Sequence, residues 1–128
     1  MLAIACGLME VILYVKDMGS QVSFYRDSLG LELTHPQGES DWASLQWVEL
    51  DTGPCTLALH AGGQRRLGED GPKIVFRVPD VPAARRQLVQ RGVPMGQVRS
   101  TAPGVQVSDG VDPEGNKFSI ESRGGVGS

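Results

Sequence analysis

Two pairs of ionisable residues occupy matching places in a pattern that occurs twice in this chain. Glu10 and Lys73 each begin a short apolar run that ends in Val-x-Asp. His60 and Glu121 each end a later segment that begins with aspartate, DTGPCTLALH in the first copy and DPEGNKFSIE in the second. Carboxylates and a neutral imidazole carry lone pairs that can bind a metal, whereas a protonated lysine carries none. Glu10 and Lys73 could instead form an ion pair or bind an anionic ligand together.

The elements that must position these residues repeat in the same order. Each copy is predicted to be a strand, a helix closed by glycine, and three further strands. In the first copy we expect strands over 9–15, 31–34, 42–50 and 55–60, with a helix that starts near Ser20 and stops at Gly30. In the second copy we expect strands over 74–78, 94–98, 105–108 and 117–122, with a helix capped by Asp80.

The duplication predicts two supersecondary units that bury a shared face, because neither half has enough core to fold well alone. Equivalent side chains would then lie opposite each other across a pseudo-two-fold axis, which favours one central pocket. The expected organisation is a single domain over 1–128, with module one over about 8–60, a polar linker over 61–72 and module two over about 73–122.

The composition excludes several kinds of partner. The chain has 128 residues, of which 40% are hydrophobic and 21% charged, as is typical of globular proteins. A net charge of −3 gives no basic footprint for nucleic acid. No apolar run approaches the roughly 20 residues that a membrane span needs. Cys6 and Cys55 form no metal motif and predict reduced thiols in a cytoplasmic protein.

Two motifs carry a resemblance to a known family. FYRDSLGLEL over 24–33 and DPEGN over 112–116, together with the Val-x-Asp strand ends, resemble the vicinal oxygen chelate superfamily from about Met9 to Ser122. This superfamily includes glyoxalase I, bleomycin resistance proteins and extradiol dioxygenases. The resemblance implies an α+β fold of two βαβββ modules whose curled mixed sheets enclose a central cavity, and it implies a homodimer. It does not fix the reaction, because these folds host diverse chemistry.

The resemblance also implies four positions for metal ligands. In the family, the first-strand ligand lies seven residues before the aspartate that ends the strand, which gives Glu10 and Lys73. The last-strand ligand of module two lies four residues after Gly115, which gives Ser119, and its counterpart in module one falls near Leu57 or Ala58. Such a set would not hold a divalent ion tightly, and glyoxalase I itself is therefore disfavoured.

A shifted alignment gives a different metal set. Aligning the two copies on Asp51 and Asp112 pairs His60 with Glu121, while aligning them on the glycines shifts the pairing by one residue. With Glu10, these two residues would form a set of one imidazole and two carboxylates, which suits Fe(II), Mn, Ni, Co or Zn. Because side chains alternate along a strand, one residue of slip decides whether His60 points inward.

Each candidate also has a simpler interpretation, and two classes of function stay open. Glu10, His60 and Glu121 could be solvated strand ends, and Trp47 a half-buried sheet residue rather than a stacking surface for a flat ligand. The first class is a protein that sequesters a small oxygenated metabolite or drug-like molecule, without a metal or other cofactor, through Glu10, Lys73, Trp47 and Ser119. The second class is a metal-dependent lyase, isomerase or dioxygenase. The incomplete ligand set favours the first.

Overall fold

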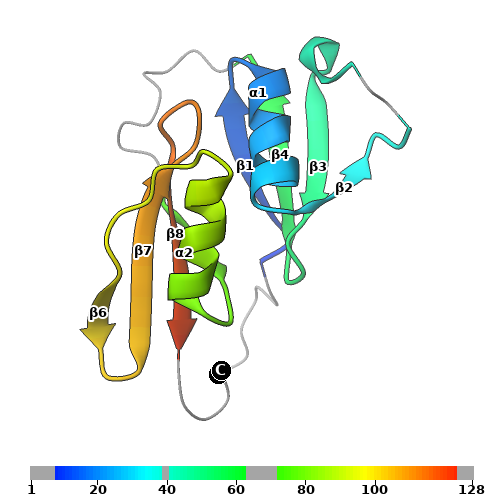
Figure 1. Ribbon diagram of the computed structural model, residues 1–128. Helices are drawn as coiled ribbons and strands as arrows, with labels where there is room; N and C mark the ends of the chain where they lie inside the picture. The colour runs from blue at the N-terminus through cyan, green and yellow to red at the C-terminus, as the bar shows by residue number, and fades with distance from the viewer. Residues whose placement is uncertain (1–7, 39–40, 63–71, 124–128) are drawn as a thin grey trace, which may run out of the picture. The chain divides into compact units, whose positions relative to one another are not determined.

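The computed structural model describes residues 8–38, 41–62 and 72–123. The chain forms two compact units, Met1–Arg65 and Arg66–Ser128, which we call unit one and unit two and describe separately. Each is a four-stranded mixed sheet with a helix on one face (Figure 1). The predicted α+β fold of two βαβββ modules is confirmed.

Unit one has the strand order β1-β4-β3-β2, in which β1 runs parallel to β4 and the other neighbours are antiparallel. Its helix continues into a π-helical turn, η1, and a short 3-10 turn, η2, precedes β3. In chain order the elements are β1 (Glu10–Val15), α1 (Met18–Val22), η1 (Ser23–Ser28), β2 (Glu32–His35), η2 (Trp42–Ser44), β3 (Trp47–Asp51) and β4 (Thr56–Ala61).

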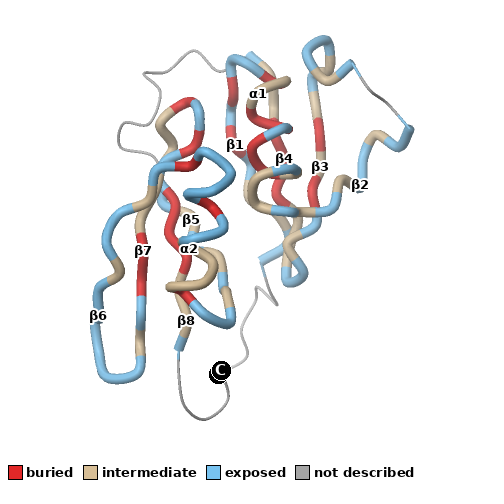
Figure 2. Tube along the Cα trace, in the orientation of Figure 1, coloured by how far each residue is buried: buried red, intermediate tan, exposed pale blue. Residues whose placement is uncertain are grey.

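The helix of unit one begins at an aspartate cap rather than at the predicted serine. The Asp17 carboxylate accepts a hydrogen bond from the Ser20 backbone N–H at 3.1 Å, so the helix starts at Met18 and not near Ser20. Gly30 ends this segment with a φ of 81°, a left-handed conformation that favours glycine. Met18, Val22, Phe24 and Tyr25 are buried, as are the sheet residues Leu13, Val15, Val48, Leu50, Leu57 and Leu59 (Figure 2).

Unit two repeats this design with the strand order β5-β8-β7-β6. The predicted cap is confirmed, because the Asp80 carboxylate accepts from the Ala83 backbone N–H at 3.1 Å. Val81 and Leu88 of the helix are buried, as are Phe118 and Ile120 of the sheet. In chain order the elements are β5 (Ile74–Arg77), α2 (Val81–Gln90), β6 (Arg99–Ala102), β7 (Val105–Val111) and β8 (Lys117–Arg123).

Two predicted strands are wrong in position. Over 42–50, residues Trp42–Ser44 form the turn η2, and the strand starts only at Trp47. This turn is closed locally, because the Leu45 N–H donates to the Trp42 carbonyl at 3.1 Å and the Ser44 hydroxyl donates to the Asp41 carbonyl at 3.2 Å. Local bonds thus replace the ladder bonds that a strand would need.

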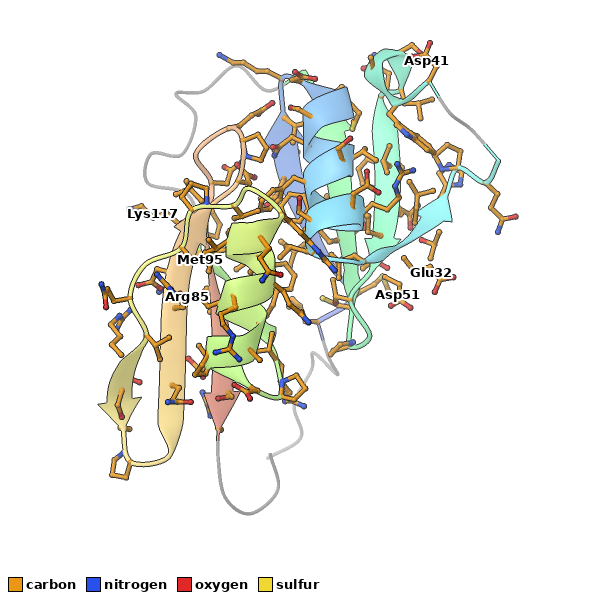
Figure 3. All side chains as sticks on the ribbon, in the orientation of Figure 1. Glu32, Asp41, Asp51, Arg85, Met95 and Lys117 are labelled. Atoms are coloured by element: carbon orange, nitrogen blue, oxygen red, sulfur yellow. The ribbon has the colours of Figure 1, made fainter. Side chains whose placement is uncertain are left out.

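The strand predicted over 94–98 is instead found at Arg99–Ala102, and the earlier segment has only one isolated bridge, Met95 to Gly110. The Gly96 carbonyl accepts from the Arg85 guanidinium at 2.7 Å and from the Ser108 hydroxyl at 2.8 Å. Arg85 thus ties α2 to this segment (Figure 3). The Gly96 N–H still donates to the Asp109 backbone carbonyl of β7 at 2.8 Å, but the side-chain bonds take up the Met95 and Gly96 carbonyls, and the segment forms a single bridge instead of a strand.

The predicted linker over 61–72 lies mostly outside the described residues. In the described part of the chain, no helix combines the length and hydrophobicity needed to cross a membrane.

Candidate functional site

The face of each sheet that lies opposite its helix carries most of the predicted site residues, and we call it the helix-free face. Successive side chains on a strand point to opposite faces, and paired residues on neighbouring strands point to the same face. Leu13 and Val15 are buried on the helix side of β1, so Glu10 lies on the other side. The helix-free face of unit one therefore comprises Glu10, Ile12 and Tyr14 of β1, Thr56, Ala58 and His60 of β4, Trp47, Glu49 and Asp51 of β3, and Glu32 and His35 of β2.

The pairing register decides the orientation of His60, which the sequence left open. His60 pairs with Tyr14 on one side and with Trp47 on the other, so it lies on the helix-free face. Its ring centroid is 5.1 Å from that of Tyr14 and 5.7 Å from that of Trp47. His60 Nδ1 lies 2.6 Å from the Ala61 carbonyl, which can only accept, so Nδ1 carries a proton and donates it.

The same registers establish which residues of the two units are equivalent. In unit one Ile12 pairs with Ala58, and in unit two Val75 pairs with Ser119. Ala58 is therefore the last-strand counterpart of Ser119, and His60 is the counterpart of Glu121, as the alignment on the two aspartates gives. Ala58 has no side-chain donor or acceptor atom and is fully buried.

Glu10 is the first residue of β1 and lies on the same face, and one of its carboxylate oxygens, Oε1, is buried without a hydrogen-bond partner among the described residues. Leaving a carboxylate oxygen unsatisfied in this way is costly, so the atom is suited to a ligand that brings a donor or a positive charge. Glu10 pairs with Thr56, at the opposite end of the strand pair from His60.

The metal set predicted from the shifted alignment does not fit a single ion. Glu10 and His60 are separated by four residues of parallel ladder, about 13 Å at ~3.3 Å per residue. Their side chains stand roughly perpendicular to the sheet, so they cannot both reach one ion at the ~2 Å that metal bonds require. Glu121, the third member, accepts instead from Arg123 at 2.9 Å. Among the described residues, no group of three His, Cys, Asp or Glu side chains is arranged to hold a metal.

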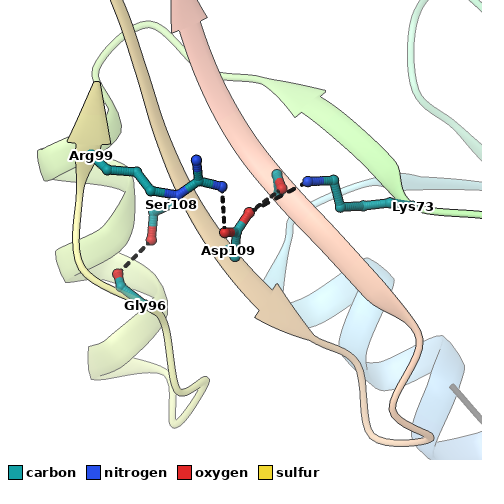
Figure 4. Close-up of polar contacts among 6 residues, drawn as sticks. Lys73, Gly96, Arg99, Ser108 and Asp109 are labelled. Atoms are coloured by element: carbon teal, nitrogen blue, oxygen red, sulfur yellow. Dashed lines mark hydrogen bonds and ion pairs between the residues drawn. The ribbon is translucent and has the colours of Figure 1, made fainter. Parts of the chain in front are cut away.

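The predicted ligand-binding residues of unit two converge on an aspartate that the sequence did not single out. Ser119 donates its hydroxyl proton to Asp109 Oδ1 at 2.5 Å, and Lys73 Nζ lies 3.7 Å from the same oxygen (Figure 4). Arg99 Nη2 lies 2.7 Å from Asp109 Oδ2. The Ser119 hydrogen bond, followed by that of Arg99, lowers the pKa of Asp109 below its ordinary value, although partial burial opposes the shift.

Glu49 is the counterpart of Asp109 in unit one, because Glu49 pairs with Ala58 as Asp109 pairs with Ser119. The Trp47 indole N–H donates to Glu49 Oε2 at 3.0 Å and fixes the carboxylate. Both acids lie on the third strand of their sheet. The signal that could have found them is an acidic residue inside a strand rich in valine or leucine, in WVELD and VQVSDGV.

A family model described as the Glyoxalase/Bleomycin resistance protein/Dioxygenase superfamily matches residues 7–120. Solved structures with the same fold include a lactoylglutathione lyase from Agrobacterium tumefaciens, with 20% identity, coverage of 94% of this chain and 96% of that one, and a TM-score of 0.72. TnmS3, an antibiotic binding protein from Streptomyces sp. CB03234, has 18% identity, coverage of 96% and 100%, and a TM-score of 0.74. No curated protein matches the chain.

Proposed function

The chain belongs to the glyoxalase/bleomycin resistance protein/dioxygenase superfamily, and we propose that within this family it binds a small molecule without using a metal ion. The ligand is an oxygenated metabolite or a drug-like compound that lies against a helix-free sheet face. The similarity to an antibiotic binding protein supports this class of function. Glu10, Trp47, Lys73 and Ser119 are the residues that we assign to ligand binding.

The observation that carries the proposal is the arrangement around Asp109. Lys73 and Ser119 occupy the two positions at which the family resemblance places metal ligands in unit two, and both are turned to Asp109. The lysine ammonium supplies positive charge in place of a metal and cannot act as a ligand itself. In unit one, Ala58 has no ligand atom, so Glu10 is the one carboxylate in the four positions.

Restoring the missing ligands gives the sharpest test. The double variant Lys73→His, Ser119→Glu places an imidazole and a carboxylate at the two family positions of unit two, beside Asp109. We expect Ni²⁺ or Zn²⁺ to raise the thermal midpoint of this variant and to leave that of the wild type unchanged. A matched control, Lys73→Met, Ser119→Gln, has side chains of similar size and should not respond to either metal.

Screening of the wild type for small-molecule ligands by thermal shift completes this test. Compounds that raise the midpoint should bind with the same affinity in the presence of a chelator. The proposal is overturned if Mn, Ni, Co, Zn or anaerobic Fe(II) stabilises the wild type and Glu10→Gln removes that effect.

A metal-dependent lyase, isomerase or dioxygenase is the second candidate, and one observation favours it. The unpartnered Oε1 of Glu10 would be satisfied by a cation as well as by an organic donor. Turnover of a substrate with two adjacent oxygens that required an added metal would establish this function. The same Glu10→Gln variant would then lose turnover while keeping its circular dichroism spectrum.

We also propose that the protein is a cytoplasmic homodimer, in keeping with its free thiol Cys55 and with the family resemblance. Sedimentation at micromolar concentration should give the mass of two chains, and the mass of one chain would overturn this assignment.

A further inference from the structure

We propose that the helix-free face of unit one binds a flat aromatic cation, such as a fused-ring molecule with a protonated or quaternary nitrogen. This inference rests on the proposed binding function and names the chemical class of the ligand. It is carried by the charge of the face, by a row of aromatic rings and by two carboxylates beside that row.

The charge of this face is entirely negative at the strand positions that form it. Four carboxylates, those of Glu10, Glu32, Glu49 and Asp51, share the face, and no lysine or arginine stands among its strand positions. Glu32 and Asp51 pair with each other at the edge and are both exposed (Figure 3). Uncompensated like charges repel one another and attract a cation.

The equivalent face of unit two shows that this charge is not a general property of the fold. There, two carboxylates, Asp109 and Glu121, are each held by arginine, and the cations outnumber the acids. The positive side chains at strand positions of that face are Arg77, Arg99, Lys117 and Arg123. The two copies of one sheet have therefore acquired opposite charge, and an anionic ligand would be repelled from unit one.

Three rings lie side by side across the face of unit one. Tyr14, His60 and Trp47 stand on neighbouring strands at matched positions, and Tyr14 is 50% exposed despite its size. The His60 ring is inclined by 36° to that of Tyr14 and meets that of Trp47 edge-on, at 86°. Aromatic faces attract organic cations and stack on flat molecules.

Two carboxylates lie along the strands from the rings. Glu49 is two residues from Trp47, about 7 Å along the strand, and is held in place by the Trp47 N–H. Between Glu49 and Ile12 lies Ala58, the smallest side chain of the face. Glu10 lies two residues before Ile12 on β1 and carries the unpartnered Oε1 atom. A molecule of two fused rings that stacks on Tyr14 and His60 can therefore direct a cationic nitrogen towards Glu49.

Three probes of matched shape test the charge preference. They are N-methylquinolinium, quinoline, which is uncharged at neutral pH, and quinoline-6-carboxylate. Binding is measured by calorimetry and by quenching of tryptophan fluorescence in a Trp42→Phe background, in which Trp47 is the remaining tryptophan. We expect the cation to bind about tenfold more tightly than the neutral probe, with the anion weakest, and the preference for the cation to fall with added salt.

Glutamate-to-glutamine variants distinguish direct contact between a carboxylate and the bound cation from the long-range attraction of all the negative charges on the face. Glu49→Gln and Glu10→Gln should each weaken cation binding about fivefold to tenfold and leave binding of neutral quinoline unchanged. Glu32→Gln removes the same charge from the exposed edge strand and should change the affinity by less than about twofold. Circular dichroism and the thermal midpoint of each variant verify that the fold is intact.

Two results separate failure of this inference from failure of the proposed function. If compounds bind but the neutral or anionic ones bind as tightly as the cations, the ligand class is wrong and the binding function stands. If neither the probes nor a small-molecule library bind to the protein, the binding function falls and the inference with it.

Discussion

Replacing Asp109 by asparagine tests the network that occupies the family's metal position in unit two. The substitution keeps the size of the side chain but removes the charge that Arg99 and Lys73 share. The two ion pairs are half exposed and each contribute about 0.2–1 kcal/mol. The bond from the fully buried Ser119 hydroxyl loses its charge assistance, which costs roughly 1 kcal/mol. Because the Asp109 side chain is 44% exposed, solvent screening leaves a total loss of about 1–2 kcal/mol.

The expected shift of the thermal midpoint is about 4–8 °C downward, since a chain of this length loses roughly 4 °C per kcal/mol. The loss of unfolding free energy in Asp109→Asn should also depend on pH. The folded-state pKa of Asp109 is lowered, so its contribution is fully present above the unfolded pKa of about 3.9 and is lost as the pH falls through the folded value. The difference between wild type and variant should therefore be constant from neutral pH to about 5 and shrink below about 4.

Urea unfolding followed by circular dichroism at neutral and acidic pH measures this difference. A matched control is Asp27→Asn, which removes a carboxylate that is 58% exposed and pairs with the adjacent Arg26 at 2.8 Å. That variant should lose less than about 0.5 kcal/mol. The reasoning is refuted if Asp109→Asn is as stable as the wild type, or if its deficit is undiminished in acid.

Three further predictions concern the scaffold. Asp17→Ala removes the helix cap and should lower the unfolding free energy by about 1 kcal/mol, whereas Asp17→Asn should recover most of it in the same urea titration. Gly110→Ala would place a methyl group 2.7 Å from Met95 Sδ and 2.9 Å from Phe118, so we expect a loss of about 1–3 kcal/mol by thermal unfolding. Met95→Ala in the double variant removes the sulfur contact but not the Phe118 contact, so a loss smaller than the sum of the two single variants would identify the Met95 clash as part of the cause. If units one and two form a single domain, calorimetry should show one cooperative transition, and two separate transitions would contradict this prediction.

The secondary structure was largely readable because its signals are local. A capping aspartate, a helical spacing of apolar residues and a closing glycine all act within a few residues, and Asp80 and Gly30 stand where they were predicted. The errors at 42–44 and 94–98 arise where side chains bond the backbone in place of a neighbouring strand. The bond from Arg85 to the Gly96 carbonyl joins residues eleven apart on a helix and a loop, and no local pattern encodes it.

The candidate site was likewise predictable from the sequence only in part. The sequence alone determined the family, the two βαβββ modules and the residue types at the implied ligand positions, including a lysine that cannot bind a metal. Only the tertiary structure decided that Ala58 is the counterpart of Ser119, that His60 lies between Tyr14 and Trp47, and that Asp109 receives Lys73 and Ser119. The physical reason is that strand register is set between segments distant in sequence, and a slip of one residue turns every side chain to the other face.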